Sequence, residues 1–365
     1  MLVDWVELTG FRSYPHVRLE PEVGINVLVG DNASGKTNVL EAIAYLASLR
    51  SFRNAADVAL VNDEAESAVV RGSVERGESS SLIEVEIPRQ GRRRVQVNGQ
   101  RPARSSDLLG HLRVVVFLPD DLDVVKRGPA YRRDFIDRTA VQLWPGAYLD
   151  QQEYERSVRQ RNSLLRQEGR DADSTTLGVW NQRMSQAGAK VMERRAQTVD
   201  AIATWVRATY VQLAGEEADV RFEYVSKWEG TLETDLETGE RAARLLAALE
   251  ENDRIDRERR VTTVGPHRDE PVVYLNGKDT RSKASQGEQR TLMLAMRLAS
   301  HEAITAAVGE PPALLLDDVF SELDRERAGA LAGALPAAQT FITTARFEEV
   351  PVEGHRWTVE EATIR

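Results

Sequence analysis

The segment INVLVGDNASGKTNVLEAIAYLASL, residues 25–49, carries the strongest fold signal in the chain. It opens with a nearly continuous apolar run, which is typical of a strand buried on both faces of a sheet. The stretch TNVLEAIAYLASL, residues 37–49, then predicts an amphipathic helix. Between the two lies GDNASGKT, residues 30–37, which fits the phosphate-binding pattern Gly-x4-Gly-Lys-Ser/Thr. A strand, this loop and a helix in that order predict a P-loop nucleotide-binding domain of the α/β class.

The residues of the loop each have a predicted task. Gly30 and Gly35 let the backbone curl so that its N–H groups face the β- and γ-phosphates of a nucleotide. Lys36 reaches the same phosphates, and the Thr37 hydroxyl binds Mg²⁺. The alternative, a glycine turn beside a solvated lysine, leaves the flanking strand and helix without a role. The predicted nucleotide-binding residues of the loop are Gly30, Asp31, Asn32, Ala33, Ser34, Gly35, Lys36, Thr37 and Asn38.

A second motif, ALLLDDV at residues 313–319, is a short apolar strand that ends in acids. It would deliver Asp317 to the carboxyl edge of an open α/β sheet, where ligands bind, and its carboxylate would bind Mg²⁺ directly or through water. Asp318 follows and could hold or deprotonate the water that attacks the phosphate. Most of the chain separates this motif from the P-loop, which predicts a nucleotide-binding head split by an insertion.

The middle of the chain differs from its ends. Residues 147–166 and 177–213 have apolar residues at helical spacing, and a short polar stretch joins them. Two such helices form an antiparallel hairpin, which is either a projecting arm or an ordinary helical subdomain. A charged helix is predicted at residues 241–260. We therefore predict an ATPase head made of residues 1–118 and 262–365, and an inserted helical arm made of residues 119–261.

Further strands are predicted from short alternating or apolar runs. Two of these runs contain an Asn-Gly pair, at Asn98-Gly99 and within VVYLNGKD, which is a strong signal for a hairpin turn. The predicted strands lie at residues 3–8, 67–74, 81–88, 93–100, 218–226, 272–279 and 340–345.

The segment ASQGEQR, residues 284–290, stands directly before a run of strong helix formers. Unpaired backbone N–H groups at a helix start are a natural seat for a phosphate. The segment is similar to the signature of ABC-class ATPases, which binds the γ-phosphate of ATP held by a partner head. We predict this role for Ser285 and Gly287, with Glu288 pointing away and SELD, residues 321–324, as the loop through which two heads touch. The alternative is an ordinary helix capped by Ser285.

Composition excludes several other classes of protein. The net charge is −10, so there is no global positive field, and the absence of cysteine excludes disulfides and thiolate metal sites. No apolar stretch approaches the ~18 residues of a membrane span, and the first residues lack the pattern of a signal peptide. We therefore expect a cytoplasmic protein without membrane contact.

Several longer motifs are similar to those of the RecF family, relatives of the SMC head domains. They are LTGFRSY (8–14), NASGKTNVLEAI (32–43), FLPDDLDVVKRGPAYRRDFID (117–137), VGPHRDE (264–270), KASQGEQR (283–290) and LLLDDVFSELD (314–324). The resemblance implies an ABC-class ATPase head with a helical insertion, and an ATP-dependent DNA-binding protein of recombinational repair, replication and the SOS response. It implies ATP-dependent homodimers that bind duplex DNA at single-strand/double-strand junctions, work with RecR and RecO to load RecA, and associate with the nucleoid. The implied ATPase is weak, is stimulated by DNA, and drives release.

The resemblance also implies roles for single residues. Arg12 would approach the nucleotide, the alternative being a surface arginine on a turn. Asp318 stands where ABC ATPases usually place glutamate, and its shorter side chain suits slow hydrolysis. Thr343, followed by a second threonine, stands where a histidine is usual, and its hydroxyl would contact the γ-phosphate or its water. His267 and Arg268 form either a structural turn or a ligand contact. The expected catalytic residues are Lys36, Ser285 and Asp318.

Contacts with DNA must come from local basic clusters because the chain as a whole is acidic. One cluster is an RRR triplet on a predicted hairpin, and another lies near the junction of head and arm. Solvated surface or internal ion pairs are the alternative for both. The candidate DNA contacts are Arg92, Arg93, Arg94, Lys126, Arg127, Arg132 and Arg133.

Two other classes share the P-loop. The ATPase subunit of a membrane transporter would also carry the signature and the acids, but the large insertion and the missing histidine argue against it. A small-molecule kinase would need a phosphate-acceptor pocket and would have no use for Ser285.

Overall fold

The computed structural model describes residues 1–231 and 236–365, and the chain divides into two compact units. Unit 1 comprises residues 1–122, 205–218 and 286–365, and unit 2 comprises residues 123–204 and 219–285. Unit 1 is thus assembled from both ends of the chain, with unit 2 as a mainly helical insertion. Residues 262–285, predicted in the head, belong to unit 2, and residues 119–122 and 205–218, predicted in the arm, belong to unit 1.

A six-stranded sheet in unit 1 carries the P-loop. Its strand order is β15-β14-β3-β13-β12-β7, and all neighbours are parallel except β14 and β15. β12 and β13 are buried at every residue, as expected of parallel strands that are covered on both faces. The strands are β3 (Ile25–Val29), β7 (Val114–Phe117), β12 (Ala313–Asp317), β13 (Thr340–Thr344), β14 (His355–Glu360) and β15 (Thr363–Ile364).

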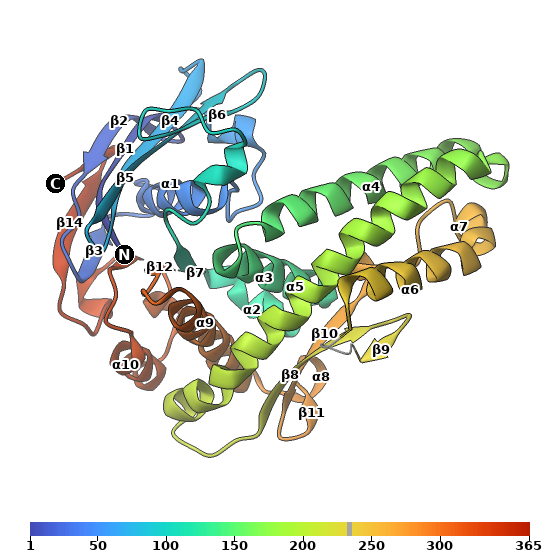
Figure 1. Ribbon diagram of the computed structural model, residues 1–365. Coiled ribbons are helices and arrows are strands. Elements are labelled where there is room, and N and C mark those ends of the chain that lie inside the picture. The colour runs from blue at the N-terminus through green and yellow to red at the C-terminus, as the bar shows by residue number, and fades with distance from the viewer. Residues whose placement is uncertain (232–235) are drawn as a thin grey trace. The chain divides into compact units, whose positions relative to one another are not determined.

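An antiparallel sheet completes the strands of unit 1. Its order is β2-β1-β4-β5-β6. Helix α1 (Lys36–Ser48) contacts strands of both sheets, and each of its residues 39–47 is buried, so it forms the centre of this core (Figure 1). The strands are β1 (Leu2–Phe11), β2 (Tyr14–Leu19), β4 (Ser67–Arg76), β5 (Ser79–Pro88) and β6 (Arg94–Val97).

Two further α-helices of unit 1 come from the C-terminal part of the chain. Helix α9 (Gln286–Val308) contacts β7, and a buried ion pair between Arg297 on α9 and Asp121 fixes it to the segment after that strand, at 2.5 Å. Helix α10 (Arg325–Ala334) begins at Asp324, whose side chain accepts a hydrogen bond from the Arg327 amide. The short 3-10 turns are η1 (Asp57–Leu60), η2 (Ser105–Leu108), η3 (Pro119–Asp121), η6 (Phe320–Glu322) and η7 (Phe347–Glu349).

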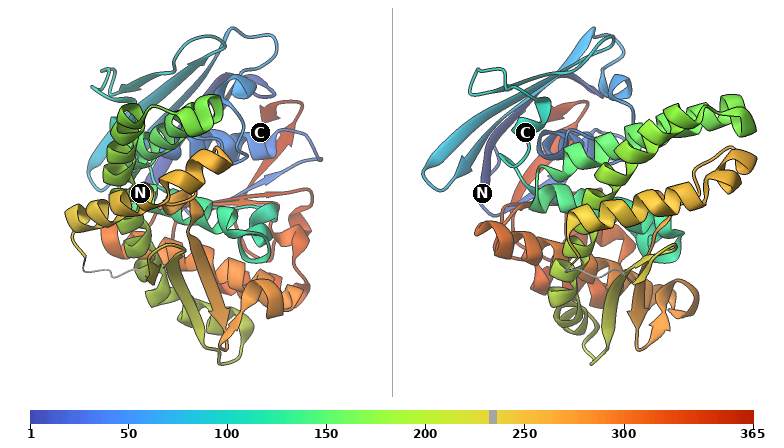
Figure 2. Two further views of the ribbon diagram at one scale, coloured as in Figure 1. Left: turned by 90° about the vertical axis from the view of Figure 1, so that its right-hand side faces the viewer. Right: turned by 45° about the vertical axis from the view of Figure 1, so that its right-hand side comes forward.

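Unit 2 is built around a pair of long helices. Figures 1 and 2 show α4 (Ala147–Glu168) and the first part of α5 (Ser174–Ala214) running side by side in opposite directions. Gly188 allows close packing here, because a Cβ at this position would lie 2.7 Å from Leu245 Cδ2 and 3.0 Å from Tyr154 Cε2. The other helices are α2 (Leu122–Lys126), α3 (Pro129–Leu143), η4 (Gly169–Asp171), α6 (Thr238–Glu251), α7 (Asp253–Arg259), η5 (Pro266–Arg268) and α8 (Thr280–Lys283).

A small antiparallel sheet and buried charges complete unit 2. The sheet has the order β11-β10-β8-β9, and α3 packs on β10. Arg161 and Asp256 form an ion pair of 2.7 Å with both side chains fully buried. The strands are β8 (Val220–Ser226), β9 (Gly230–Thr231), β10 (Glu270–Leu275) and β11 (Lys278–Asp279).

Most predicted elements form where the sequence indicates them, with three differences. Asn98 and Gly99 both have positive φ and make a tight turn, but only the isolated bridge between Val97 and Gln100 flanks it; β6 pairs with β5 instead. The predicted helix at 241–260 breaks at Asn252 into α6 and α7. Strands β2, β7, β9, β14 and β15 and helices α2, α3, α8 and α10 lie outside the predicted elements. Strands β7, β9 and β15 are short, whereas β2 is the hairpin partner of β1 and its residue pattern does not indicate a strand.

Candidate ATP site and signature helix

The P-loop joins β3 to α1 at the carboxyl end of the parallel sheet. Ala33 and Gly35 have positive φ values of 68° and 110°, which give the loop its curl. A Cβ on Gly30 would lie 2.2 Å from the carbonyl oxygen of Val359, so no larger residue fits beside β14. A Cβ on Gly35 would lie 2.7 Å from the Tyr14 hydroxyl. Both glycines are therefore required by local geometry.

The Lys36 side chain binds the backbone at the start of the P-loop. Its ammonium group donates to the carbonyl oxygens of Gly30 at 2.6 Å and Asp31 at 2.8 Å, and the residue is only 7% exposed. Burial lowers the pKa of Lys36, and the charges of Asp318, Asp317 and Asp31 oppose that shift. The lysine is held where a phosphate would meet the loop.

The two motifs predicted to act together do meet. The Thr37 hydroxyl donates to Asp317 Oδ1 at 2.7 Å, although the two residues are 280 positions apart. Parallel pairing of β12 with β13 puts Thr343 beside Asp317, and its hydroxyl donates to the same oxygen at 2.8 Å. Burial raises the pKa of Asp317, while the hydrogen bonds from Thr37 and Thr343 oppose the rise. A hydroxyl and a carboxylate are thus paired at the edge of the sheet.

Asp318 has an unusual backbone conformation. Its φ is 51°, in the left-handed region, and its amide donates to the Thr343 hydroxyl at 2.9 Å. Thr343 therefore touches both acids, rather than standing apart from them as a separate phosphate contact. Its predicted contact with the nucleotide remains a prediction.

The polar atoms around the loop fit a bound Mg–nucleotide. Ser34 Oγ and Asp318 Oδ1 are both buried without a hydrogen-bond partner in the described part of the chain. Buried polar atoms are rarely left unpaired unless a ligand or water completes them. Within residues 1–231 and 236–365 there is no group of three or more His, Cys, Asp or Glu that could hold a metal ion, so Mg²⁺ would depend on Thr37, Asp317 and the phosphates.

Arg12 has a different partner from the one predicted. Its guanidinium makes two hydrogen bonds of 2.9 Å to the fully buried carboxylate of Glu41 and a third to the carbonyl of Ala59. These contacts fix the turn after β1 to helix α1, and the predicted contact of Arg12 with a nucleotide remains a prediction.

Arg53 is a neighbour of the site that sequence reasoning missed. It donates to Asn38 Oδ1 at 3.2 Å and lies 3.8 Å from Glu41, and its charge lowers the otherwise raised pKa of Asp317. Its side chain is 44% exposed. It follows α1 in the sequence, but no spacing rule distinguishes it from other surface arginines.

The predicted signature stands at the start of α9. Ser285 is exposed and directly precedes the first helical residue, Gln286, and Gly287 lies in the first turn. The SELD loop overlaps the end of η6, and Glu322 faces Arg290 of α9 at 3.8 Å. The helix and the loop are thus neighbours within unit 1.

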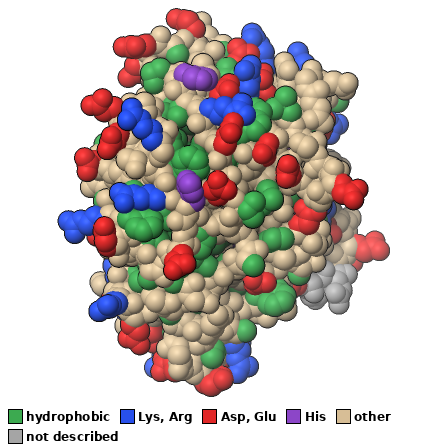
Figure 3. All heavy atoms as spheres, turned by 90° about the vertical axis from the view of Figure 1, so that its left-hand side faces the viewer, with side chains coloured by type: hydrophobic (Ala, Val, Ile, Leu, Met, Phe, Trp, Pro, Cys, Tyr) green, Lys and Arg blue, Asp and Glu red, His purple; other side chains and the backbone are tan. Residues whose placement is uncertain are grey.

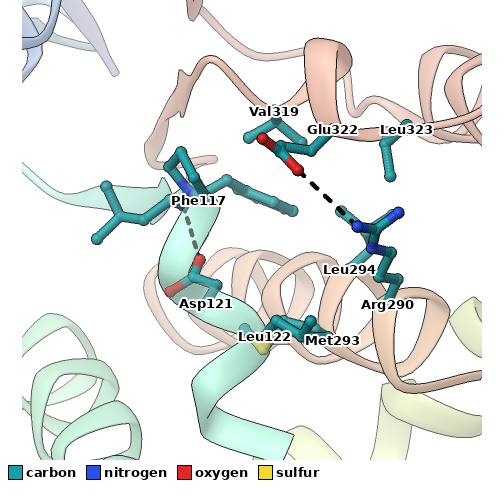
Figure 4. Close-up of a pocket in the computed structure, with 11 residues that line it drawn as sticks. Phe117, Asp121, Leu122, Arg290, Met293, Leu294, Val319, Glu322 and Leu323 are labelled. Atoms are coloured by element: carbon teal, nitrogen blue, oxygen red, sulfur yellow. Dashed lines mark hydrogen bonds and ion pairs between the residues drawn. The ribbon is translucent and has the colours of Figure 1, made fainter. Parts of the chain in front are cut away.

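A small pocket of about 90 Å³ lies between these elements (Figure 4). Apolar side chains from the end of β7, from α9 and from the SELD loop line it, and the Arg290–Glu322 pair lies at one side. The lining residues include Phe117, Leu122, Met293, Leu294, Val319 and Leu323.

Two of the three arginines in the RRR cluster already bind other groups of the protein. Arg93 donates to the Leu49 carbonyl at 2.5 Å and to the Tyr45 hydroxyl at 3.0 Å, and Arg94 pairs with Glu86 at 2.9 Å. Arg92 is exposed. On the face drawn in Figure 3, acidic and basic side chains are interspersed, without a large basic patch.

The second basic cluster, near the junction of head and arm, contains one wrongly predicted DNA contact, Arg132. Arg132 is 4% exposed and donates to the carbonyls of Pro271, Val124 and Arg127, so it cannot meet a phosphate in this conformation. Arg133 donates to the Asp269 carbonyl at 2.6 Å. Lys126 and Arg127 are exposed, and the Arg127 guanidinium pairs with Asp123. Burial therefore removes only Arg132 from the candidates, and Lys126, Arg127 and Arg133 remain predictions.

The GPHRD segment is a structural turn. His267 Nδ1 lies 2.7 Å from the Tyr154 hydroxyl, and Arg268 donates two hydrogen bonds to the Thr262 carbonyl. Burial lowers the pKa of His267 to about 4, so the ring is neutral in the folded protein at neutral pH. Of the two interpretations left open, these contacts favour the structural one.

The fold and the site together define an ABC-type ATPase head with a helical insertion. The family model described as "RecF/RecN/SMC N terminal domain" matches residues 2–355. The chain is 39% identical over 369 residues to the DNA replication and repair protein RecF of Acidothermus cellulolyticus, covering 100% of this chain and 99% of the relative. It is 40% identical over 374 residues to the protein of the same name from Frankia alni, with 98% of each chain covered. The chain belongs to the RecF family.

Solved structures agree with this assignment. The recombination mediator protein RecF with ATP, of the RecFOR pathway, matches with a TM-score of 0.86 and 28% identity, covering 100% of this chain and 98% of that chain. The Smc head bound to the C-winged helix domain of ScpA matches with a TM-score of 0.57 and 17% identity, over 100% and 96% of the two chains. The second match shows the shared fold alone.

Proposed function

We propose that this chain is an ATP-dependent DNA-binding protein of recombinational repair and replication. ATP joins two copies on duplex DNA near single-strand gaps, and slow hydrolysis releases them. The observation that carries the proposal is the 2.7 Å hydrogen bond between Thr37 and Asp317, which unites the P-loop with the acidic strand end. The names of the relatives above support the connection with DNA replication and repair.

The residues of the site suit Mg–ATP. Thr37 and Asp317 would hold Mg²⁺, since a hydroxyl and a carboxylate are oxygen ligands of the kind that this ion prefers. Lys36 would exchange the carbonyls of Gly30 and Asp31 for phosphate oxygens. Bound ATP supplies the phosphoanhydride bond that is hydrolysed, and Asp318 would hold the attacking water.

A weak, DNA-stimulated ATPase acting as a switch fits Asp318. The carboxylate is shorter than glutamate, and its backbone is held in the left-handed region with φ 51°. A water held by such a group would be oriented poorly until binding of DNA or of a second copy changes the site. Catalysis depends strongly on orientation, so slow basal hydrolysis is expected.

The expected partners are DNA, a second copy of the chain, and RecR, RecO and RecA. The RecFOR assignment of the solved relative supports RecO and RecR, and action on DNA would place the protein in the cytoplasm with the nucleoid. Among the described residues, no helix is both long and apolar enough to cross a membrane. None of the similar proteins named above is a transporter subunit, so that alternative is not carried forward.

Sedimentation velocity tests the ATP-driven pairing. The wild type, Ser285→Arg and the control Ser79→Arg would be run with Mg–ATP, with Mg–ADP and without nucleotide, each with and without gapped duplex DNA. Ser79 is an exposed serine on β5 and gains the same charge. We expect dimers only with ATP in the wild type and the control, and monomers that still bind ATP for Ser285→Arg. If the wild type stays monomeric with ATP and DNA, the proposal fails.

A further inference from the structure

Gly287, in the first turn of α9, has a neighbour that explains why it is glycine. A Cβ at this position would lie 2.5 Å from Nη2 of Arg327. The φ of Gly287 is not in the left-handed region, so the helix itself does not require glycine here. The space that a side chain would fill is taken by the guanidinium of Arg327, which comes from α10.

Arg327 is fixed in this position from two sides. Its guanidinium forms an ion pair with Asp324 of the SELD loop, and its Nε donates to the Thr291 hydroxyl at 3.4 Å. The Thr291 hydroxyl in turn donates to the Gly287 carbonyl at 3.1 Å. The arginine therefore links the loop to the first turn of α9, and its side chain remains 37% exposed.

Arg327 places a positive charge at the start of helix α9, where a cation without a nearby anion is unfavourable. The start of a helix carries a partial positive charge, which favours anions and disfavours cations. Glu288 lies in this first turn of α9. Burial raises the pKa of Tyr210, the charge of Glu288 adds to the rise, and the charge of Arg327 opposes it. Both charges therefore act on the same tyrosine. A cation held beside an acidic first turn can offset the repulsion that a glutamate would exert on a phosphate.

We propose that Arg327 is the cation of the signature helix, which offsets Glu288 and helps to bind the terminal phosphate of ATP carried by a second copy of this chain. The inference rests on the ATP-driven pairing proposed above. It also gives Gly287 a specific task, which is to leave room for the guanidinium. The SELD loop binds the same arginine through Asp324. Contact between the SELD loops of two copies would therefore be coupled to recognition of the phosphate by Arg327.

The test compares four variants with the wild type: Arg327→Gln, Arg327→Lys, Gly287→Ala, and the double variant Gly287→Ala/Arg327→Gln. The control is Arg325→Gln, which removes an exposed positive charge from the same first turn of α10. The dimer dissociation constant is measured by sedimentation with Mg–ATP and with Mg–ADP. The ATP affinity of the monomer and the melting temperature are measured beside it.

We expect Arg327→Gln to weaken the ATP-dependent dimer at least about tenfold, the effect of losing one charge-assisted hydrogen bond. ATP affinity of the monomer and behaviour with ADP should not change, and Arg327→Lys should recover part of the loss. Gly287→Ala should act in the same way without lowering the melting temperature, since the atom that must move is the end of a flexible side chain. In the double variant the alanine should add nothing to the effect of Arg327→Gln.

The outcomes separate this inference from the proposed function. If the wild type does not pair with ATP, both fail. If the wild type pairs and Arg327→Gln pairs equally well, or is no worse than Arg325→Gln, only the role of Arg327 is overturned. If Gly287→Ala remains as damaging in the Arg327→Gln background, the glycine serves the approach of the phosphate itself, and the steric link to Arg327 is overturned.

Discussion

Thr343 shows how a single residue can organise the site without being charged. Its hydroxyl donates to Asp317 and accepts from the amide of Asp318, so one side chain sets the positions of both acids. Thr344, the next residue, is equally buried, but its hydroxyl donates to the carbonyl of Arg346 instead. Alternation along β13 thus sends one threonine to the acids and the other away from them.

Thr343→Val is therefore expected to slow ATP hydrolysis more than it weakens ATP binding. Hydrogen bonds to charged groups contribute roughly 1.5–3 kcal/mol, which corresponds to about tenfold to a hundredfold in kcat if both acids lose their positions. Steady-state hydrolysis and equilibrium ATP binding check this. Thr344→Val is the matched control and should keep its kcat; equal kcat values for wild type and Thr343→Val would contradict the positioning role.

At the scale of elements, the P-loop depends on the contact between β3 and its neighbour β14. These strands are parallel, and the loop leaves β3 where the carbonyl of Val359 approaches Gly30. Because that oxygen belongs to the backbone of β14, it cannot move aside without shifting the strand. The glycine is required by sheet packing as well as by the phosphate.

Gly30→Ala should therefore destabilise the protein even without nucleotide, by ~3 kcal/mol, the range typical of forced backbone shifts in a packed core. It should also abolish ATP binding. Urea unfolding and nucleotide titration measure the two effects. Gly329→Ala in α10 is the control, because a Cβ there meets nothing within 4 Å, and alanine in a helix should stabilise by up to about 1 kcal/mol. Unchanged stability of Gly30→Ala would show that β14 does not restrict the loop.

Across the whole molecule, each unit contains a histidine whose ring is kept neutral by its surroundings. Burial lowers the pKa of His267 in unit 2 and of His301 in unit 1 to about 4, from an unfolded value near 6.5. His301 is held by a contact of 3.1 Å with the Pro312 carbonyl. The unfolded chain takes up these protons first as pH falls, so stability is complete above pH ~6.5 and is lost progressively towards pH ~4.

Lowering the pH from 7.5 to 5.5 should cost about 1.4 kcal/mol of unfolding free energy for each of the two histidines. Urea unfolding at the two pH values measures this loss. His267→Gln and His301→Gln should each remove about 1.4 kcal/mol of this loss, whatever their effect at pH 7.5. A pH dependence that is the same in both variants as in the wild type would show that other groups cause it.

Features that depend on neighbours along the chain could be predicted from the residues alone. The strand, glycine loop and helix at residues 25–49, the acidic end of the strand at Asp317, and the helix start after Ser285 all follow from periodicity and from the conformations that glycine allows. The ATPase fold and the family could be predicted from these motifs together. The pairing of Thr37 with Asp317 was predictable because parallel strands present their carboxyl ends at one edge.

The partners of the charged side chains, in contrast, depend on which distant segments the fold brings together. Arg12 bonds Glu41, Arg132 is buried among carbonyls, and Arg53 lies near the acids, yet nothing in the local sequence separates these arginines from one another. The same holds for Arg327 over Gly287, which are brought together by the packing of α10 against α9. An arginine is long and can pair with any acid or carbonyl within reach, so its role is set by which distant segments the fold places beside it.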